Sequence, residues 1–269
     1  MESTITDKIE EFELRLNILE RKILAMENLL SEYFPLSIEK ILERKGLKIA
    51  RSDRDIPVFD REKLYLQFKS YYFRRTLHDL LFLKKIDQNS RGLIVKKWGK
   101  NVDSYLDVAS KLGIIRFENN IYIAQYPVSF MGILLEWFIG KFLREELNLE
   151  TVINVRLKNL PEGGDIDILS RIGKNIVMIE CKESPPNNIP VSELKAINER
   201  VRILKSDIFL LAIDTTLSIK RNIVDNLQWI LKSEIVRVKE GVYKASNNFF
   251  IVTAKRDLLQ NIAFCITEA

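Results

Sequence analysis

The sequence predicts an α/β protein in which a mixed β-sheet is flanked by helices and preceded by a small helical region and a long N-terminal helix. Three observations support this. Apolar residues recur in steps of three and four through 1–34, residues 35–127 show mostly helical patterns, and short strand-like and helical runs alternate over 128–269. Side chains repeat every 3.6 residues on a helix and every two on a strand, so these periods distinguish the elements.

Residues 1–34 carry the heptad pattern of a coiled coil. The apolar seam consists of Ile5, Ile9, Phe12, Leu16, Leu19, Ile23, Met26, Leu30 and Tyr33. Basic g residues precede acidic e residues of the next heptad, as Lys8–Glu13, Arg15–Glu20 and Lys22–Glu27. A parallel dimer pairs these opposite charges, whereas an antiparallel one opposes like charges. We expect a parallel coiled-coil homodimer; the alternative is an amphipathic helix packed on its own chain, supported by Leu14, Ile18 and Leu24 outside the seam.

Residues 35–127 are expected to form a small helical region closed by a hairpin. Helical patterns cover 36–44, 61–73, 76–86 and 102–112, and strand-like runs at 112–117 and 121–124 flank the turn signal Glu118-Asn119-Asn120. This order resembles a winged helix-turn-helix, with Val102–Leu112 as recognition helix and Arg116–Tyr122 as wing.

The charge of this region favours nucleic acid as a partner. Residues 35–127 hold 19 Lys and Arg and 11 Asp and Glu, a net +8, although the whole chain carries only +5. Lysine and arginine neutralise backbone phosphates, so DNA is the expected partner. The predicted contacts are Arg74, Arg75, Lys96, Lys97, Lys100, Lys111 and Arg116. The alternative is a solvated surface on a protein–protein adaptor.

Residues 128–269 follow the order helix, strand, strand, strand, helix, strand, helix, strand. The first helix, Phe130–Leu147, is apolar nearly all round and should be buried. Three strands at 151–158, 165–170 and 176–182 form a meander. Helix 191–204, strand 208–213 and helix 219–232 follow. A mixed sheet covered by helices accommodates this order.

Acidic residues and a lysine gather on two strands of this meander. Alternation predicts that Asp165 and Asp167 share one face and that Glu180 and Lys182 share one face of the next strand. Other acidic-x-Lys tripeptides, beginning at Glu20, Glu43 and Glu193, lie on predicted helices, where residues two apart point in different directions. The strand placement therefore makes Asp167, Glu180 and Lys182 the candidate site.

These residues resemble the PD-(D/E)xK nuclease superfamily over roughly residues 130–213. Asp167 matches the first acid and Glu180-Cys181-Lys182 the E-x-K; Ile166 stands where many members have proline. The resemblance implies a restriction-endonuclease-like fold in which Asp167, Glu180 and the Cys181 backbone carbonyl bind Mg²⁺ or Mn²⁺. Lys182 would orient or activate the attacking water. Asp165 is a rival or auxiliary ligand, and Glu136 is either a metal-assisting glutamate or a surface carboxylate.

Composition excludes several other kinds of site. His78 is the single histidine and the two cysteines are Cys181 and Cys265, which leaves no His-rich zinc cluster or disulfide framework. No apolar run reaches membrane-spanning length, so we expect a soluble cytoplasmic protein without a membrane or a small-molecule organic cofactor. The predicted function is that of a homodimeric Mg²⁺-dependent DNA endonuclease. Alternatives are a catalytically degenerate DNA-binding regulator and a coiled-coil adaptor.

The predicted domains are therefore 1–34 as a coiled-coil helix, 35–127 as a winged-helix-like basic domain and 128–269 as a nuclease-like domain.

Overall fold

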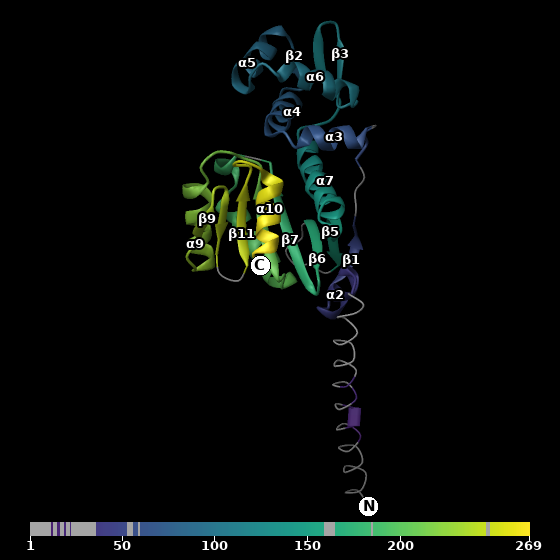
Figure 1. Cartoon of the computed structure of the whole chain (residues 1–269), viewed down its shortest axis with the longest axis vertical. Coiled ribbons are helices and arrows are strands. Elements are labelled where there is room, and N and C mark those ends of the chain that lie inside the picture. The colour runs from purple at the N-terminus through teal and green to yellow at the C-terminus, as the bar shows by residue number, and fades with distance from the viewer. Residues whose placement is uncertain are drawn as a thin grey trace, which may run out of the picture.

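A computed structural model of the chain describes residues 36–269 except 53–55, 59, 159–164, 184 and 246–247, together with positions 12, 15, 16, 19 and 22. The coiled-coil prediction for residues 1–34 therefore falls almost entirely outside the described residues. The described chain is built around an eight-stranded mixed sheet with helices on both faces (Figure 1). The predicted fold class, a mixed sheet flanked by helices, is confirmed.

The large sheet has the order β1-β5-β6-β7-β8-β11-β10-β9. Its strands are β1 (Lys48–Arg51), β5 (Glu150–Lys158), β6 (Ile166–Ile172), β7 (Asn175–Lys182), β8 (Ile208–Ile213), β9 (Val236–Lys239), β10 (Val242–Lys244) and β11 (Phe249–Thr253). The central strands β7, β8 and β11 are parallel, and the pairs outside them are antiparallel. β8 is buried along its whole length, as expected for a strand covered on both faces.

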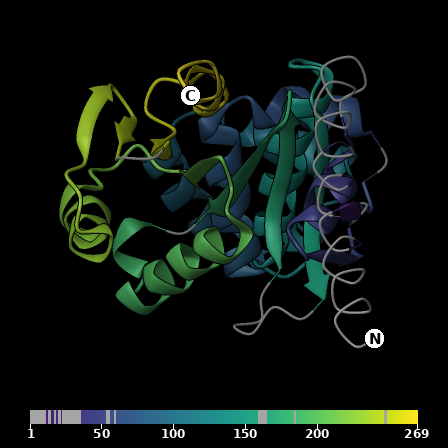
Figure 2. The same ribbon diagram turned by 90° about the horizontal axis from the view of Figure 1, so that it is seen from below.

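Two apolar cores lie on opposite faces of the sheet. One face packs against α7 (Phe130–Glu145) and α10 (Leu258–Thr267). The other packs against α2 (Ile38–Arg44), α8 (Val191–Leu204) and the helical segment formed by η2 (Lys220–Val224) and α9 (Asp225–Leu231). The view from below shows α8 and α10 on opposite sides of the sheet (Figure 2). The result is a three-layer arrangement of helix, sheet and helix.

A smaller helical region lies beside one end of the sheet (Figure 1). Its elements are α3 (Arg61–Phe68), α4 (Tyr71–Leu83), β2 (Lys85–Ile86), α5 (Gln88–Trp98), α6 (Val102–Lys111), β3 (Ile115–Glu118) and β4 (Ile121–Ala124). The three strands form a separate antiparallel sheet in the order β2-β4-β3. Its core is continuous with the α7 core of the large sheet.

Helix α7 joins the two parts. Gly140 lies so close to β5 that a Cβ there would come within 2.6 Å of Cγ2 of Ile153. On the other side, Lys141 Nζ lies 2.6 Å from a carboxylate oxygen of Glu62 at the start of α3. The hydroxyl of Tyr65 donates to Glu146 at 2.7 Å. These contacts hold α7 against both β5 and α3.

The segment before the helical region belongs to the large sheet. β1 pairs with β5 through Lys48↔Lys158 and Ile49↔Leu157, and α2 packs in the core on the same sheet. The helical region at 61–124 is thus inserted between two parts of the sheet layer. This placement puts residues 38–51 with the sheet rather than with the predicted helical domain that begins at residue 35.

Several element boundaries differ from the predictions. The helix expected over 61–73 ends at Phe68, because the hydroxyl of Ser70 accepts a bond from the Phe73 amide and begins α4. The helix expected over 76–86 ends at Leu83, where Lys84 takes a positive φ of 64°. Elements α5, β1, β2 and α10 were not predicted, and three strands, β9 to β11, follow α9 where the sequence indicated one. The second hairpin strand, 121–124, lies where the sequence placed it, whereas the first is 115–118 rather than 112–117, because Leu112 ends α6.

Candidate active site

Asp167 and Glu180 lie next to each other on adjacent strands. In the antiparallel pair β6–β7, Ile168 faces Ile179, and Asp167 and Glu180 are the next residues outward on their strands. Glu180 is buried, whereas Asp167 and Lys182 are partly exposed. The site therefore lies at the carboxyl end of β7, and β7 pairs there in parallel with β8.

Asp165 does not share the environment of Asp167. Pairing between β5 and β6 is interrupted between Ile153↔Ile168 and Val155↔Ile166, where Asn154 has a φ of +51°. Ile168 belongs to the α7 core and Ile166 to the opposite core, so the alternation of faces changes here. Asp165 instead pairs at the surface with Arg51, at 3.1 Å. The expected common face for Asp165 and Asp167 is therefore wrong, because strand alternation holds only in an uninterrupted strand.

Glu180 is the centre of a charged network. One carboxylate oxygen, Oε1, accepts from Lys182 Nζ at 2.8 Å and from Arg200 Nη2 at 2.9 Å. Lys182 Nζ also lies 2.7 Å from a carboxylate oxygen of Glu193. Burial opposes the charge of Lys182, but Glu180 and Glu193 outweigh it, and the pKa of Lys182 is raised. Lys182 is therefore an ammonium at neutral pH.

Asp167 is held by the backbone of the neighbouring strand. Its Oδ2 accepts a hydrogen bond of 2.7 Å from the Cys181 amide. Burial and the charges of Glu180 and Glu136 raise the pKa of Asp167 well above its usual value. Burial and Asp167 likewise raise the pKa of the Cys181 thiol, so it is not a thiolate. Glu136, on α7, thus acts electrostatically on the site.

Hard oxygen donors at this site suit Mg²⁺ or Mn²⁺. The second Glu180 oxygen, Oε2, is buried without a hydrogen-bond partner. Repulsion between Asp167, Glu180 and Glu136 is the kind that a divalent cation would relieve. Among the described residues, however, no group of three or more His, Cys, Asp or Glu side chains is arranged as a metal cluster. The fit thus rests on two carboxylates, with Glu136 near them.

Arg200 and Glu193 were missed by the sequence reasoning. Both lie on α8, seven residues apart and hence on one face, and they contact Glu180 and Lys182 respectively. Glu193 begins one of the acidic-x-Lys tripeptides that the sequence places on helices. The available signal was this seven-residue spacing on the helix that follows the E-x-K strand. Lys195, the other residue of that tripeptide, lies over the ring of Trp229 at 4.8 Å.

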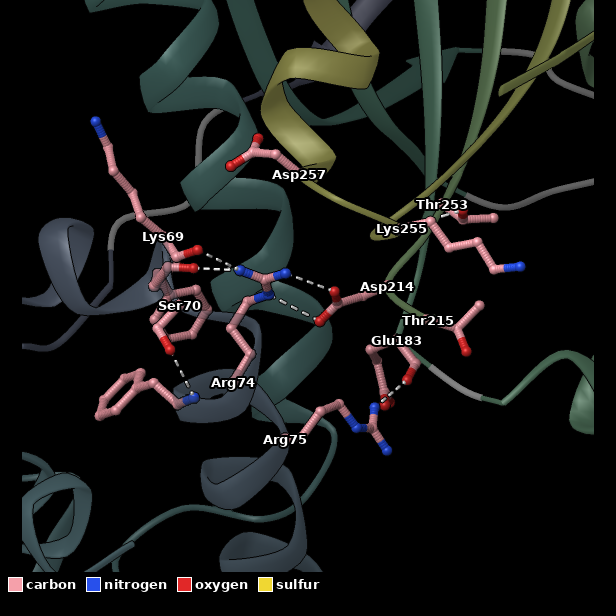
Figure 3. Close-up of polar contacts among 12 residues, drawn as sticks. Lys69, Ser70, Arg74, Arg75, Glu183, Asp214, Thr215, Thr253, Lys255 and Asp257 are labelled. Carbon is pink, nitrogen blue, oxygen red and sulfur yellow. Dashed lines mark hydrogen bonds and ion pairs between the residues drawn. The ribbon is translucent and has the colours of Figure 1, made fainter. Parts of the chain in front are cut away.

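The predicted phosphate contact of Arg74 is replaced by a structural role. Arg74 is 2% exposed and binds Asp214 with two hydrogen bonds of 2.8 and 2.9 Å (Figure 3). Arg75 is also buried, and its guanidinium donates to the carbonyl of Glu183 at 3.0 Å. The two arginines join α4 to the ends of β7 and β8.

The other predicted nucleic-acid contacts are at the surface. Lys96, Lys97, Lys100, Lys111 and Arg116 are all exposed. Lys97 pairs with Asp79 at 2.7 Å and Arg116 with Glu118 at 3.0 Å. They lie on α5, on α6, on β3 and in the turn between α5 and α6. A bound phosphate would compete with the Arg116–Glu118 pair, which is exposed on both sides and therefore weak, and with the Lys97–Asp79 pair, in which Asp79 is largely buried.

Comparison with solved structures shows two proteins of similar fold. Protein VC1899 from Vibrio cholerae matches with a TM-score of 0.50 and 14% identity over 86% of this chain and 61% of that one. Can2 from Sulfobacillus thermosulfidooxidans, solved in complex with cyclic tetra-adenylate, matches with a TM-score of 0.52 and 13% identity over 87% of this chain and 60% of that one. The chain thus spans about three fifths of either protein, and identities this low show the fold alone.

No family model matches the sequence, and neither does any curated protein. The part of the chain that the structure describes contains no helix both long and apolar enough to cross a bilayer.

Proposed function

We propose that the protein is a metal-dependent endonuclease that hydrolyses phosphodiester bonds at Asp167, Glu180 and Lys182. One observation carries the proposal: the buried Glu180 has an oxygen without a partner beside a lysine that is held as a cation. A buried unpaired carboxylate oxygen costs stability, so it indicates a ligand or a function. The resemblance of these residues to the PD-(D/E)xK motif supports the same reading.

The residues divide the chemistry among them. Asp167 and Glu180, with the Cys181 carbonyl, would hold Mg²⁺ or Mn²⁺, which when bound supplies Lewis-acid activation of water and phosphate. Because Lys182 is an ammonium, its role is to stabilise negative charge on the phosphate rather than to remove a proton. Arg200 fixes the Glu180 carboxylate, and Glu193 positions Lys182. Glu136 adds negative charge that favours a cation.

DNA would be bound by the inserted helical region. Its order of α4, β2, α5, α6, β3 and β4, with a three-stranded antiparallel sheet, supports the winged-helix reading, with α6 as recognition helix and β3–β4 as wing. Exposed basic residues on these elements support phosphate contacts.

Homodimerisation would be provided by the heptad segment. The seam positions Phe12, Leu16 and Leu19 are 69%, 48% and 56% exposed in the single chain. Large apolar side chains exposed in one stripe favour a partner helix. Two copies would bring two sites to one nucleic acid. Deletion of residues 1–34 should then yield a monomer in analytical ultracentrifugation, and a persistent dimer would refute the coiled coil.

The test of the activity is cleavage of plasmid, single-stranded and branched DNA, and of RNA, with Mg²⁺ or Mn²⁺. Asp167→Ala and Lys182→Ala should each reduce the rate by at least about a hundredfold. Glu199→Gln is the matched control, since Glu199 precedes Arg200 on α8 but pairs at the surface with Arg202. Cleavage that survives both site variants would refute the assignment.

A DNA-binding regulator with a degenerate site is the second candidate. Three features favour it: two cations already bind one Glu180 oxygen, Lys182 is paired on both sides, and no three-residue metal cluster exists among the described residues. Tight DNA binding without cleavage in either metal would support this function. If the protein neither binds nor cleaves DNA, the remaining candidate is a coiled-coil adaptor.

A further inference from the structure

A cavity lies between the helical region and the carboxyl ends of β7 and β8. Its volume is about 280 Å³, and it is lined by Tyr71, Arg75, Lys97 and Trp98 on one side and by Pro185 and the turn at 214–217 on the other. Ligands of open α/β sheets bind beyond the carboxyl ends of parallel strands, and β7 and β8 are such a pair.

Aromatic rings form two walls of this cavity. The rings of Tyr71 and Trp98 are 6.4 Å apart and nearly perpendicular, at 87°. The indole nitrogen of Trp98 donates to Asp79 at 2.7 Å, which fixes the orientation of the ring. A corner of this kind accepts one planar ring, stacked on one wall and facing the other with its edge.

Positive charge lies beside the aromatic walls. The guanidinium of Arg75 is 6.0 Å from the centre of the Trp98 ring, and Lys97 Nζ, which pairs with Asp79 at 2.7 Å, is 4.8 Å from it. The one carboxylate in the lining, that of Asp214, is neutralised by Arg74 (Figure 3). An aromatic ligand that carries an anionic group fits this combination, and a nucleotide has this chemistry.

The cavity adjoins the candidate active site. The Asp214 amide donates to the carbonyl of Lys182 at 2.8 Å, and Arg75 binds the carbonyl of Glu183, the next residue. A nucleotide held in this cavity could therefore belong to the same nucleic-acid strand as a phosphate bound by Lys182. The volume is also slightly below the usual range for drug-sized ligands, about 300–1,000 Å³, so one nucleotide fits better than several.

We propose that this cavity is a subsite for one unstacked base of the nucleic-acid strand whose phosphodiester is bound at Asp167, Glu180 and Lys182. This proposal rests on the proposed function, because that function supplies the nucleic-acid strand as the ligand. Unpaired bases are commonly held by stacking on aromatic side chains and arginine planes. The protein would then favour single-stranded, frayed or branched nucleic acid, because a base in a duplex must first leave its stack.

The test uses the full chain in EDTA, so that binding is measured without hydrolysis. A set of single-stranded DNA oligonucleotides carries 2-aminopurine at successive positions, and a second set carries one abasic site. We expect a change in 2-aminopurine fluorescence at one or two adjacent positions. An abasic site there should weaken binding about fivefold to a hundredfold. A response equal at all positions would overturn the proposal.

Matched variants distinguish the contribution of the Trp98 ring to binding from that of its hydrogen bond to Asp79. Trp98→Leu and Trp98→Phe both remove the bond to Asp79, but only Phe retains a stacking surface. Affinity should follow Trp98, then Phe, then Leu, and Trp98→Leu should lose the abasic effect. Trp229→Leu is the control, because Trp229 lies on α9, is 65% exposed and does not line the cavity. Circular dichroism melting checks that the variants fold. Equal affinity of the Leu and Phe variants would refute stacking.

Titration with dAMP and AMP distinguishes a free nucleotide from a base of the strand. Binding of dAMP that depends on Trp98, together with a flat positional scan, would assign the cavity to a free nucleotide and overturn the strand assignment. The same positional scan, compared with the cleavage assay, tests the subsite independently of the proposed activity. A positional response without cleavage in Mg²⁺ would support the subsite but not catalysis, whereas cleavage with a flat scan would refute the subsite alone.

Discussion

Two buried carboxylates at neighbouring strand ends differ in how their oxygens are paired. The side chains of Asp214, after β8, and Glu180, on β7, are each 3% exposed. Both oxygens of Asp214 are bound by one arginine, Arg74, in a planar two-point contact. One oxygen of Glu180 receives two cations while the other receives none. The first arrangement satisfies a buried charge, and the second leaves part of a buried charge for a ligand.

The strongest test of this contrast removes the arginine partner of each carboxylate. Arg74→Met should destabilise the protein by about 3–5 kcal/mol, because Asp214 would remain buried and unpaired. Arg200→Met should cost less, since Glu180 retains Lys182. Urea unfolding followed by circular dichroism measures both. Equal losses would mean that the two carboxylates are equivalent structural groups.

Metal-induced stabilisation should depend on Asp167 but not on Asp165. At about 100 times its Kd, a bound ion adds about 2.7 kcal/mol to the free energy of unfolding. We expect Mn²⁺ to raise the melting temperature of the wild type and of Asp165→Asn. Asp167→Asn and Glu180→Gln should lose the shift. A shift lost in Asp165→Asn and kept in Asp167→Asn would reverse the assignment of the ligand.

Without metal, Asp167 should destabilise the fold at neutral pH. Its pKa is raised in the folded state, so the folded state binds more protons than the unfolded state above pH 3.8, and stability falls as pH rises toward the folded pKa. Asp167→Asn should therefore gain stability in EDTA at pH 7.5, and the gain should vanish near pH 3.8. A loss of stability at pH 7.5 would contradict the repulsion between Asp167 and its neighbours.

The smallest effect is expected at His78, which links α4 to Glu183. Its imidazole lies 3.5 Å from Asp79 and 3.2 Å from Glu183, and hydrogen bonds to these two carboxylates raise the pKa of His78 above 6.5. Its stabilisation is complete below pH 6.5 and is lost as pH rises through the folded pKa. His78→Gln should cost on the order of 1 kcal/mol at pH 6 and less at pH 9, measured by urea unfolding. A cost independent of pH would show that the histidine is neutral.

The layers of the sheet were predictable where periodicity was strong. Strands β6, β7 and β8 and helices α7 and α8 are long apolar patterns, and their order alone indicated a mixed sheet. β1 was not predictable, because a strand of four mostly exposed residues pairs with β5 about a hundred residues later. Helix α5 was missed because its pattern is weak: it contains Gly92, and only Ile94 is buried.

The candidate site was accessible from sequence only in part. Alternation along β7 places Glu180 and Lys182 on the face that α8 covers, as expected for residues two apart. The same rule failed for Asp165, since the irregularity at Asn154 cannot be read from side-chain pattern. Arg200 and the pairing of Arg74 with Asp214 depend on tertiary contacts 20 and 140 residues apart in the chain.

The position of α7 has a mechanical consequence. The helix is wedged against β5 at Gly140, bonded to α3 through Lys141, and carries Glu136 toward the site. It can therefore neither slide along the sheet nor detach from α3 without breaking close contacts. A displacement of α3 would therefore be passed to α7 and would move Glu136 relative to the sheet. Because the charge of Glu136 raises the pKa of Asp167, such a movement would change the electrostatic field at the candidate site.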